Sequence, residues 1–330
     1  MSGKLCVLGA GSWGTALSIA LSSRFACVSV LAHHPERARD IEQTRENQRY
    51  LPGFLLPQNV RVSSSAADAL ESAAMVLIAL PSHALRTTLV QMSSLVPARA
   101  RLVSATKGLE LETLLRVSQV VAEAVGRNQI VVLSGPTYAR EIAAGEPAAV
   151  VVAAHALSAA EEVQAALSTA HLRFYASDDP IGVETGAALK NVIAIGAGIC
   201  HGLGLGSNCV AALVTRGLAE ITRLAVRLGG NPRTLSGLAG LGDLVLTATG
   251  DLSRNRCVGI ELGRGRTLAE ILESMTMVAE GVPTCRAARD LALREGVSAP
   301  IIEQMFEVLY RAKDPRTAIR ELMDRPLTIE

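Results

Sequence analysis

The segment GAGSWGTA at positions 9–16 constrains this chain more than any other, because its glycines follow the spacing G-x-G-x-x-G. It comes directly after the apolar run 5–8 and opens a helical pattern of apolar residues, which is the context of a dinucleotide-binding βαβ unit. Gly9 would permit the tight turn, Gly11 the approach of a pyrophosphate, and Gly14 the close packing of helix and strand. The alternative is a glycine-rich turn without a ligand, which this placement disfavours.

The residues after the second apolar run bear on the choice between NAD and NADP. An NAD-selective site usually has a carboxylate there, which accepts hydrogen bonds from the ribose hydroxyls. Here the run 27–31 is followed by Ala32, His33, His34 and Pro35, so the carboxylate is missing. An imidazole can donate to a ribose phosphate, so His33 is a candidate cofactor contact and NADP is permitted. The alternative is that both histidines are solvated turn residues.

Short apolar or β-branched runs recur through the first half of the chain. Several of them are separated by stretches long enough for a helix, which predicts parallel βαβ units in an open, doubly wound sheet. The runs are 5–8, 27–31, 75–79, 102–104, 130–133 and 149–153.

After about residue 185 apolar residues recur at helical spacing, as at Leu213, Gly217 and Ile221 and again at Ile302 and Met305. The sequence therefore predicts an α/β protein with two domains. A Rossmann-type doubly wound sheet would occupy residues 1–183 and an all-helical domain residues 184–330. The boundary is placed in the polar stretch 178–184.

Composition excludes several classes of partner and site. The 32 basic and 31 acidic residues nearly cancel, so no overall field would attract nucleic acid or an anionic membrane surface. Asn191, His201 and several glycines interrupt the apolar segment 189–205, which favours a buried helix over a membrane span. The apolar run that follows the first residues is better interpreted as a strand than as the apolar core of a secretory leader, so we expect a cytoplasmic protein.

Six cysteines are scattered along the chain without C-x-x-C spacing. This pattern argues against a zinc site, so no metal is expected, and against a disulfide framework. We expect these cysteines to be reduced, small core residues.

Three charged residues stand in apolar segments or directly after a strand, positions that favour a role in proton transfer or ligand binding. Lys190 begins an apolar helix, where burial would lower the pKa of its ammonium toward the range of a general acid or base; alternatively it snorkels to the surface. Lys107 follows the run 102–104 at the expected ligand-binding edge of the sheet, although a lysine there is often merely solvated. Asp243 lies in an apolar, glycine-rich segment and, if buried, would need a cation or several hydrogen-bond donors; Lys190 is the preferred partner.

Two further segments carry groups suited to a phosphate. SGPTYA at 134–139 follows a strand and presents Gly135, Thr137 and backbone N–H groups, unless it is an ordinary turn. Ser253, Arg254 and Asn255 supply a hydroxyl, a guanidinium and an amide in succession. A helix cap beside a surface arginine would produce the same three residues.

Taken in chain order, these segments resemble bacterial-type NAD(P)-dependent glycerol-3-phosphate dehydrogenases. Each segment alone is weak evidence for the family, but the ordered series covers most of the chain and is highly specific. The segments are GAGSWGTA, NQRYLPG, LPSHALR, TKGLE, LSGPTYAREIAAG, ALKNVIAIGAGI, GLGLGSN, TRGLAE, GLAGLGDLVLT, SRN and AEGVPT. The resemblance implies reduction of dihydroxyacetone phosphate to sn-glycerol 3-phosphate with NADPH or NADH, which supplies the glycerol backbone of phospholipids.

The resemblance also implies a role for each matching residue. Lys190 would exchange the hydroxyl proton while hydride passes between nicotinamide and substrate carbon, and its neutral form would be the base in the oxidation direction. Lys107 would contact substrate and cofactor. The other implied substrate contacts are Gly135, Thr137, Asp243, Ser253, Arg254 and Asn255. The implied cofactor contacts besides the glycines are Ser12, Trp13, His33, Ala139, Arg254, Val278 and Glu280. Two positions depart from the family pattern, because His33 stands where an arginine is common and the lead VETGAALKN differs slightly from the usual one.

Two alternatives remain open. A 3-hydroxyacid or 6-phosphogluconate type dehydrogenase also has a Rossmann domain, a helical second domain and a lysine near an asparagine, but it would need a carboxylate-binding serine and glycine loop in place of SGPTYA and SRN. A non-catalytic NAD(P) sensor would need the glycine loop but neither Lys190 nor Asp243. The expected partners are a small phosphorylated substrate and a second copy of the chain in a homodimer.

Overall fold

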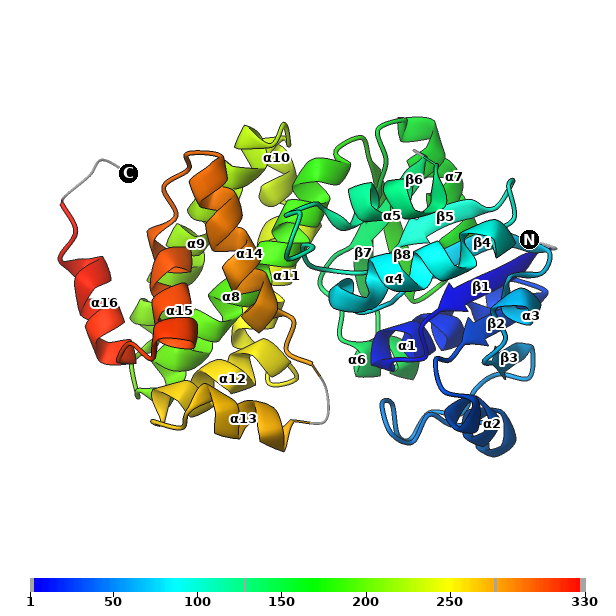
Figure 1. Ribbon diagram of the computed structural model, residues 1–330, viewed down its shortest axis with the longest axis horizontal. Helices are drawn as coiled ribbons and strands as arrows, with labels where there is room; N and C mark the ends of the chain where they lie inside the picture. The colour runs from blue at the N-terminus through cyan, green and yellow to red at the C-terminus, as the bar shows by residue number, and fades with distance from the viewer. Residues whose placement is uncertain (1–2, 128, 276–277, 327–330) are drawn as a thin grey trace.

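A computed structural model describes residues 3–127, 129–275 and 278–326. Figure 1 shows a half built around a β-sheet, which contains the N-terminus, and a half built from helices, which contains the end of the chain. Residues 1 and 2, which precede the run expected to be a strand and not part of a secretory leader, lie outside the described part.

A single eight-stranded sheet forms the first half, with the order β3-β2-β1-β4-β5-β6-β7-β8. All neighbouring strands are parallel except β6 and β7, which are antiparallel. The strands are β1 (Lys4–Leu8), β2 (Cys27–Leu31), β3 (Val60–Ser63), β4 (Ala73–Ile78), β5 (Arg101–Ser104), β6 (Ile130–Ser134), β7 (Ala148–Ala153) and β8 (Leu172–Ser177).

All six strands predicted from apolar runs are present, and the doubly wound fold is confirmed. Two edge strands, β3 and β8, were not predicted, because each alternates buried and exposed residues and so lacks a continuous apolar run. The expectation of parallel units is wrong for β7. Only the short helix α6 (Ala139–Ala144) lies between β6 and β7, and β7 returns beside β6 in the opposite direction.

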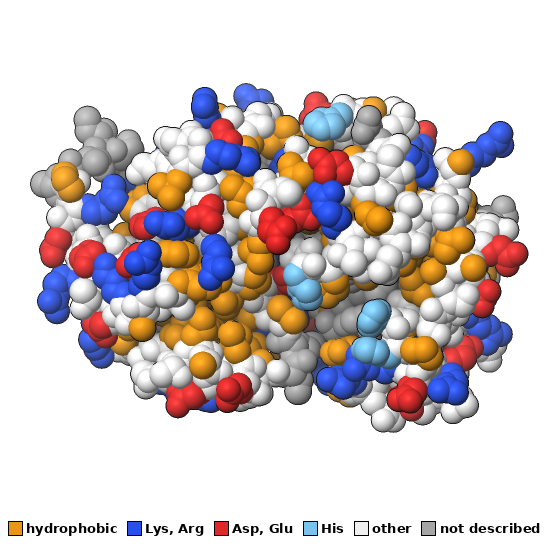
Figure 2. Space-filling view, viewed as in Figure 1, with side chains coloured by type: hydrophobic (Ala, Val, Ile, Leu, Met, Phe, Trp, Pro, Cys, Tyr) orange, Lys and Arg blue, Asp and Glu red, His pale blue; other side chains and the backbone are white. Residues whose placement is uncertain are grey.

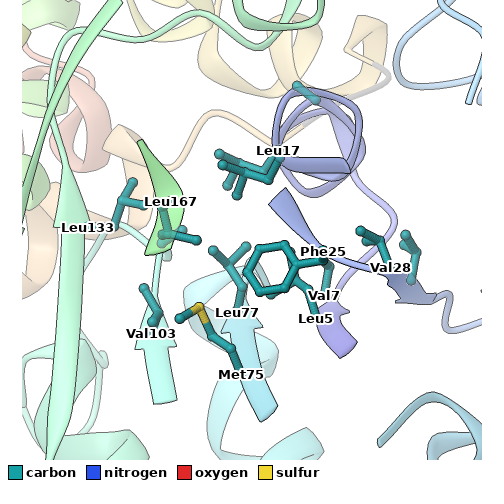
Figure 3. Packing of buried hydrophobic residues seen from close by; sticks show 14 of the residues in the cluster. Leu5, Val7, Leu17, Phe25, Val28, Met75, Leu77, Val103, Leu133 and Leu167 are labelled. Atoms are coloured by element: carbon teal, nitrogen blue, oxygen red, sulfur yellow. The ribbon is translucent and has the colours of Figure 1, made fainter. Parts of the chain in front are cut away.

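Helices cover both faces of the sheet, so its central strands are apolar on both sides. Leu5 and Val7 of β1 pack with Leu17 on one face (Figure 3), whereas Cys6 and Leu8 pack with helices on the other. The helices of this half, besides α6, are α1 (Ser12–Leu21), α2 (Pro35–Thr44), α3 (Ala66–Leu70), α4 (Ser82–Met92), α5 (Val117–Val125) and α7 (Leu157–Leu167).

The second half is helical throughout its described residues, as predicted. Its helices are α8 (Pro180–Gly202), α9 (Ser207–Arg227), α10 (Pro232–Leu235), α11 (Asp243–Thr249), α12 (Arg254–Gly263), α13 (Leu268–Ser274), α14 (Gly281–Arg294), α15 (Pro300–Arg311) and α16 (Pro315–Met323). α8 is central, since α9, α11, α12 and α14 all pack against it. Within the described residues, α8 alone is long and apolar enough to cross a membrane, and its apolar window is fully buried in the protein, which confirms a core helix.

The cysteine prediction holds in part. All six thiols are free, and Cys6, Cys200 and Cys285 are buried. Cys257 is exposed, so the expectation of a core position is wrong for this residue, which faces solvent from α12. The division of the chain at 183/184 stays a prediction.

Candidate active site between the sheet and the helical half

The glycine loop between β1 and α1 has the geometry that its spacing predicts. Gly9 has a φ of +115°, and a Cβ there would lie 2.6 Å from the carbonyl oxygen of Ala79. A Cβ at Gly14 would lie 2.0 Å from the carbonyl oxygen of Gly9, so α1 can pack this closely on the loop after β1 only because residue 14 has no side chain. At Gly11 a Cβ would meet nothing within 4 Å, so the backbone there faces open space into which a pyrophosphate fits.

Trp13, in the first turn of α1, supplies a second observation that fits a cofactor. Its indole Nε1 is buried and has no hydrogen-bond partner among the described residues. A buried donor without a partner is costly and is usually satisfied by a ligand or by water. Loop and indole together fit a bound dinucleotide.

Two alanine substitutions separate these roles. We expect Gly11→Ala to fold like the wild type, because its Cβ enters open space, but to weaken NADPH binding about 10-fold by blocking the close approach. We expect Gly14→Ala to lower the free energy of unfolding by about 1–3 kcal/mol, because the backbone must shift. Denaturant unfolding and fluorescence titration with NADPH measure the two effects. Unchanged affinity in Gly11→Ala would contradict the role of this face.

The carboxyl ends of β5 and β6 lie at one edge of the sheet, because these strands are parallel. Lys107 follows β5, and Gly135 follows β6 with a φ of +149°. The ammonium of Lys107 donates to the carbonyl oxygen of Gly135 at 3.3 Å. Thr137 lies in the same loop, and its hydroxyl donates to the same carbonyl at 3.2 Å. The structure thus brings together Lys107, Gly135 and Thr137.

Asp243 joins this edge to the helical half. Its Oδ1 accepts a short hydrogen bond from Lys190 on α8, and its Oδ2 accepts from Lys107 at 2.8 Å. Asp243 is fully buried and Lys190 is 5% exposed, so the snorkelling interpretation of Lys190 is wrong. The predicted pairing of Lys190 with Asp243 is confirmed. The sequence did not predict that Lys107 would share the same carboxylate.

The environment of Lys190 lowers the pKa of its ammonium from an ordinary 10.5 to about 7. Burial is the main cause, because desolvation disfavours the charged form. Asp243 opposes this shift by attracting the ammonium, whereas Lys107 reinforces it by repulsion. At neutral pH both forms of Lys190 are therefore populated, as proton exchange in either direction requires.

Two side chains missed by sequence reasoning hold this cluster. The hydroxyl of Thr247 accepts from Lys190 at 2.8 Å and donates to the backbone carbonyl of Asp243 at 2.6 Å. Ser134 donates to Oδ2 of Asp243 at 3.4 Å. The spacing of four residues between Asp243 and Thr247 on one helix was the available signal for Thr247.

A π-helical turn, Leu238–Gly242, leads into Asp243. Gly240 within it packs so closely that a Cβ would lie 2.1 Å from the carbonyl oxygen of Leu235. Wide turns of this kind are frequent at functional sites because they redirect the following residue. Here the glycine-rich segment places Asp243 at the start of α11, against α8.

The segment 253–255 is both a helix cap and a neighbour of the site. Ser253 caps α12, because its hydroxyl accepts from the backbone N–H of Arg256. Asn255 donates to the side-chain oxygen of Asn191 at 2.9 Å and accepts from the N–H of Gly281 at 2.9 Å. The amide of Asn255 thus ties α12 to the residue after Lys190 and to the start of α14.

The remaining predicted cofactor contacts lie on elements of both halves. The guanidinium of Arg254 donates to the carbonyl of Val278 at 3.0 Å, and Glu280 accepts from Ser82, at the start of α4, at 2.9 Å. This second contact joins the two halves. Ser12 and Ala139 begin α1 and α6, which pack against each other.

His33 lies apart from the lysines, exposed at the carboxyl end of β2. Its ring packs edge to face against His34, with centroids 4.6 Å apart. In Figure 2 the surface is hollowed between the two halves, and histidines lie beside the hollow.

Comparison with known proteins agrees with this geometry. The family model described as the N-terminus of NAD-dependent glycerol-3-phosphate dehydrogenase matches residues 4–160, and the model of its C-terminus matches residues 179–320. The chain belongs to the NAD-dependent glycerol-3-phosphate dehydrogenase family.

Several relatives within this family are similar over their full length. A glycerol-3-phosphate dehydrogenase [NAD(P)+] from Geobacter sp. (strain M21) is 49% identical, with 100% of this chain and 99% of the relative covered. One of the same name from Koribacter versatilis is 50% identical, covering 99% and 98%. A crystal structure of the glycerol-3-phosphate dehydrogenase from Coxiella burnetii has a TM-score of 0.94 and 36% identity, covering 98% and 99%.

Proposed function

We propose that this chain catalyses the NAD(P)-dependent interconversion of dihydroxyacetone phosphate and sn-glycerol 3-phosphate, and thereby supplies glycerol phosphate for phospholipid synthesis. The observation that carries the proposal is the buried cluster in which Lys190 and Lys107 share Asp243 at the ligand-binding edge of the sheet. A non-catalytic sensor of the dinucleotide has no need of a buried lysine whose pKa lies near 7. The names of the family relatives support the same substrate.

In this proposal the bound nicotinamide supplies or accepts the hydride at the substrate carbon. Lys190 in its ammonium form donates a proton to the substrate oxygen during reduction, and its neutral amine accepts that proton during oxidation. Asp243 and Thr247 hold the Nζ of Lys190 in place, so its remaining N–H is free to face the substrate. Lys107 faces the same region and adds a positive charge that stabilises a developing alkoxide.

The substrate phosphate requires a separate set of donors. Arg254 offers a guanidinium, and the helix start at α12 offers backbone N–H groups. The hydroxyl of Ser253 can still donate while it accepts from Arg256. The proposed substrate contacts are Lys107, Gly135, Thr137, Lys190, Asp243, Ser253, Arg254 and Asn255.

The dinucleotide would lie along the glycine loop and cross to the helical half. Its proposed contacts are Gly9, Gly11, Ser12, Trp13, Gly14, His33, Lys107, Ala139, Arg254, Val278 and Glu280. We further propose that the protein works in the cytoplasm as a homodimer, with a sheet domain at 1–183 and a helical domain at 184–330.

A steady-state assay tests the proposal. Purified full-length protein should oxidise NADPH or NADH when given dihydroxyacetone phosphate. In the reverse assay it should not reduce NADP+ or NAD+ when given a 3-hydroxyacid or 6-phosphogluconate. Turnover of a hydroxyacid alone would favour the related dehydrogenase class. Cofactor binding without turnover of any of these substrates would favour a sensor.

A further inference from the structure

Two cysteines meet where α8 gives way to α9 in the helical half. Cys200 lies in the last turn of α8 and Cys209 in the first turn of α9. Their sulfur atoms lie 3.4 Å apart, within hydrogen-bond distance for sulfur, and both thiols are free. The proposed reaction uses neither thiol, so the proposed catalytic cluster does not explain this pair.

The backbone between the two helices keeps the thiols next to each other. The N–H of Leu205 donates to the carbonyl of Cys200 at 2.9 Å, and the N–H of Cys209 donates to the carbonyl of Gly206 at 3.1 Å. Gly204 has a φ of +72°, a conformation that favours glycine and lets the chain reverse direction. α8 and α9 also pack against each other along the helical half (Figure 1). The pair is therefore part of a defined helical hairpin.

The separation of the sulfur atoms permits a covalent bond without movement of the helices. Sulfur atoms in a disulfide lie about 2.05 Å apart, so a pair at 3.4 Å must approach by about 1.4 Å. Rotation of both side chains about their Cα–Cβ bonds can supply this approach. Two reacting groups that the fold already holds together react faster than groups that must first meet.

The two thiols differ in exposure, which assigns a different role to each. Cys200 is 3% exposed, whereas Cys209 is partly exposed. Burial, and after it the hydrogen bond with Cys209, raises the pKa of the Cys200 thiol to about 12. Cys200 therefore stays protonated near neutral pH. An oxidant in solution meets Cys209 first, and Cys200 is placed to react with the product.

We propose that Cys200 and Cys209 form a modification site, at which a hydroperoxide produces a reversible disulfide that ties the end of α8 to the start of α9. With hydrogen peroxide, the sulfur of Cys209 first attacks one peroxide oxygen. An S–O bond forms, the O–O bond breaks, and the released hydroxide takes the thiol proton and leaves as water. The product is a sulfenic acid on Cys209.

In the second step the sulfur of Cys200 attacks the sulfur of Cys209. The S–S bond forms, the S–O bond breaks, and the departing hydroxide takes the proton of Cys200 and leaves as water. Two thiols have then lost two electrons in total, and one hydrogen peroxide has been reduced to two waters. A thiol reductant reverses the bond by exchange, as expected of disulfides in a reducing compartment.

The disulfide should stabilise the helical half without disturbing the proposed catalytic cluster. Lys190 precedes Cys200 by ten residues on α8, which is about 15 Å along the helix. Its partners Asp243 and Thr247 lie on α11, which the cross-link does not touch. A cross-link mainly restricts the unfolded chain, so we expect a higher apparent Tm and a turnover within about twofold of the reduced protein.

Peptide mapping of the full-length protein tests the site without any measurement of activity. The protein is treated with hydrogen peroxide, then with catalase, and is alkylated under denaturing conditions. Both cysteines lie on one tryptic peptide, 191–216, because the chain has no lysine or arginine between Lys190 and Arg216. We expect this peptide to be lighter by two hydrogen atoms and unlabelled after oxidation, and to carry two labels after dithiothreitol. The apparent Tm should rise by about 3–6 °C on oxidation and return on reduction.

Three variants make the assignment falsifiable. Cys209→Ser should abolish the cross-link and the rise in Tm. Cys200→Ala keeps the exposed thiol but removes its partner, so a sulfenic acid should accumulate on Cys209 and be captured by dimedone. Cys257→Ser is the matched control, since Cys257 is exposed on α12 and its loss should leave the cross-link and the Tm rise unchanged.

Two labels on the peptide 191–216 after peroxide treatment would overturn the proposal, and so would an equal rise in Tm in Cys209→Ser. Loss of turnover in the cross-linked wild type, restored by dithiothreitol, would contradict the expectation that the cluster is undisturbed. A protein that forms the cross-link but turns over no substrate would refute the proposed reaction and leave this site standing.

Discussion

Replacing Lys190 with methionine should lower kcat for dihydroxyacetone phosphate reduction by about 10³-fold and leave the Kd for NADPH within about twofold. Methionine nearly fills the volume of the lysine side chain but cannot hold a proton, and a positioned general acid contributes typically ~10²–10⁴-fold to rate. Lys190 donates to Asp243 and Thr247 of α11, where the helical half meets the sheet, and these hydrogen bonds do not involve the glycine loop. Single-turnover assays and fluorescence titration measure the two quantities.

The pH dependence is the control for this prediction. Reduction needs the ammonium form of Lys190, so in the wild type its rate should decline as the pH rises through about 7, and the rate of oxidation should rise over the same range. Both profiles should flatten near pH 7 in Lys190→Met. Residual turnover that keeps the wild-type pH profile would assign the proton exchange to a different group.

Replacing Asp243 with asparagine should damage both catalysis and stability. The substitution leaves Lys190 and Lys107 facing each other without their shared counter-charge in a fully buried position. Removal of one partner from a buried ionic cluster destabilises a protein by about 3 kcal/mol or more. Urea unfolding near pH 7 should show this loss as a lower midpoint with an unchanged slope.

The catalytic effect of Asp243→Asn follows from the pKa of Lys190. Asp243 raises that pKa against the effect of burial, so its removal lets the pKa fall below 7. Less ammonium is then present at neutral pH, and we expect the rate of dihydroxyacetone phosphate reduction to fall about 10²-fold or more, with its pH profile displaced to lower pH. Thr247→Val is the matched control, because it removes a hydrogen bond from Lys190 but keeps every charge. A similar displacement in both variants would show that hydrogen bonding, and not charge, sets the pKa.

Local patterns were sufficient for most of the fold. A continuous apolar run marks each buried strand from β1 to β7 except β3, and helical spacing marks α9 and α15. These signals succeed because side-chain burial has a period that the sequence displays directly. They fail for short strands that are buried on one face only, as in β3 and β8. They also carry no information on strand direction, so the antiparallel placement of β7 was missed.

The candidate site, like the fold, was predicted only in part from the sequence. The sequence indicated Lys107, Lys190 and Asp243 singly, because a charged residue in apolar surroundings needs an explanation. It paired Lys190 with Asp243 correctly. The contact of Lys107 with the same carboxylate, the hydroxyl of Thr247 and the hydrogen bond from Asn255 to Asn191 appeared only in the structure. Their partners lie far apart in the chain, and local spacing does not specify such contacts.

By itself the sequence determined the dinucleotide loop, the sheet-then-helix order and, through its ordered segments, the resemblance to glycerol-3-phosphate dehydrogenases. Only the tertiary structure decided that two lysines share one buried carboxylate and that burial lowers the pKa of Lys190 to about 7. The glycine loop is encoded by steric requirements of neighbouring residues. A pKa and a charge cluster depend on desolvation and on distances across the fold, which exist only after the chain has packed.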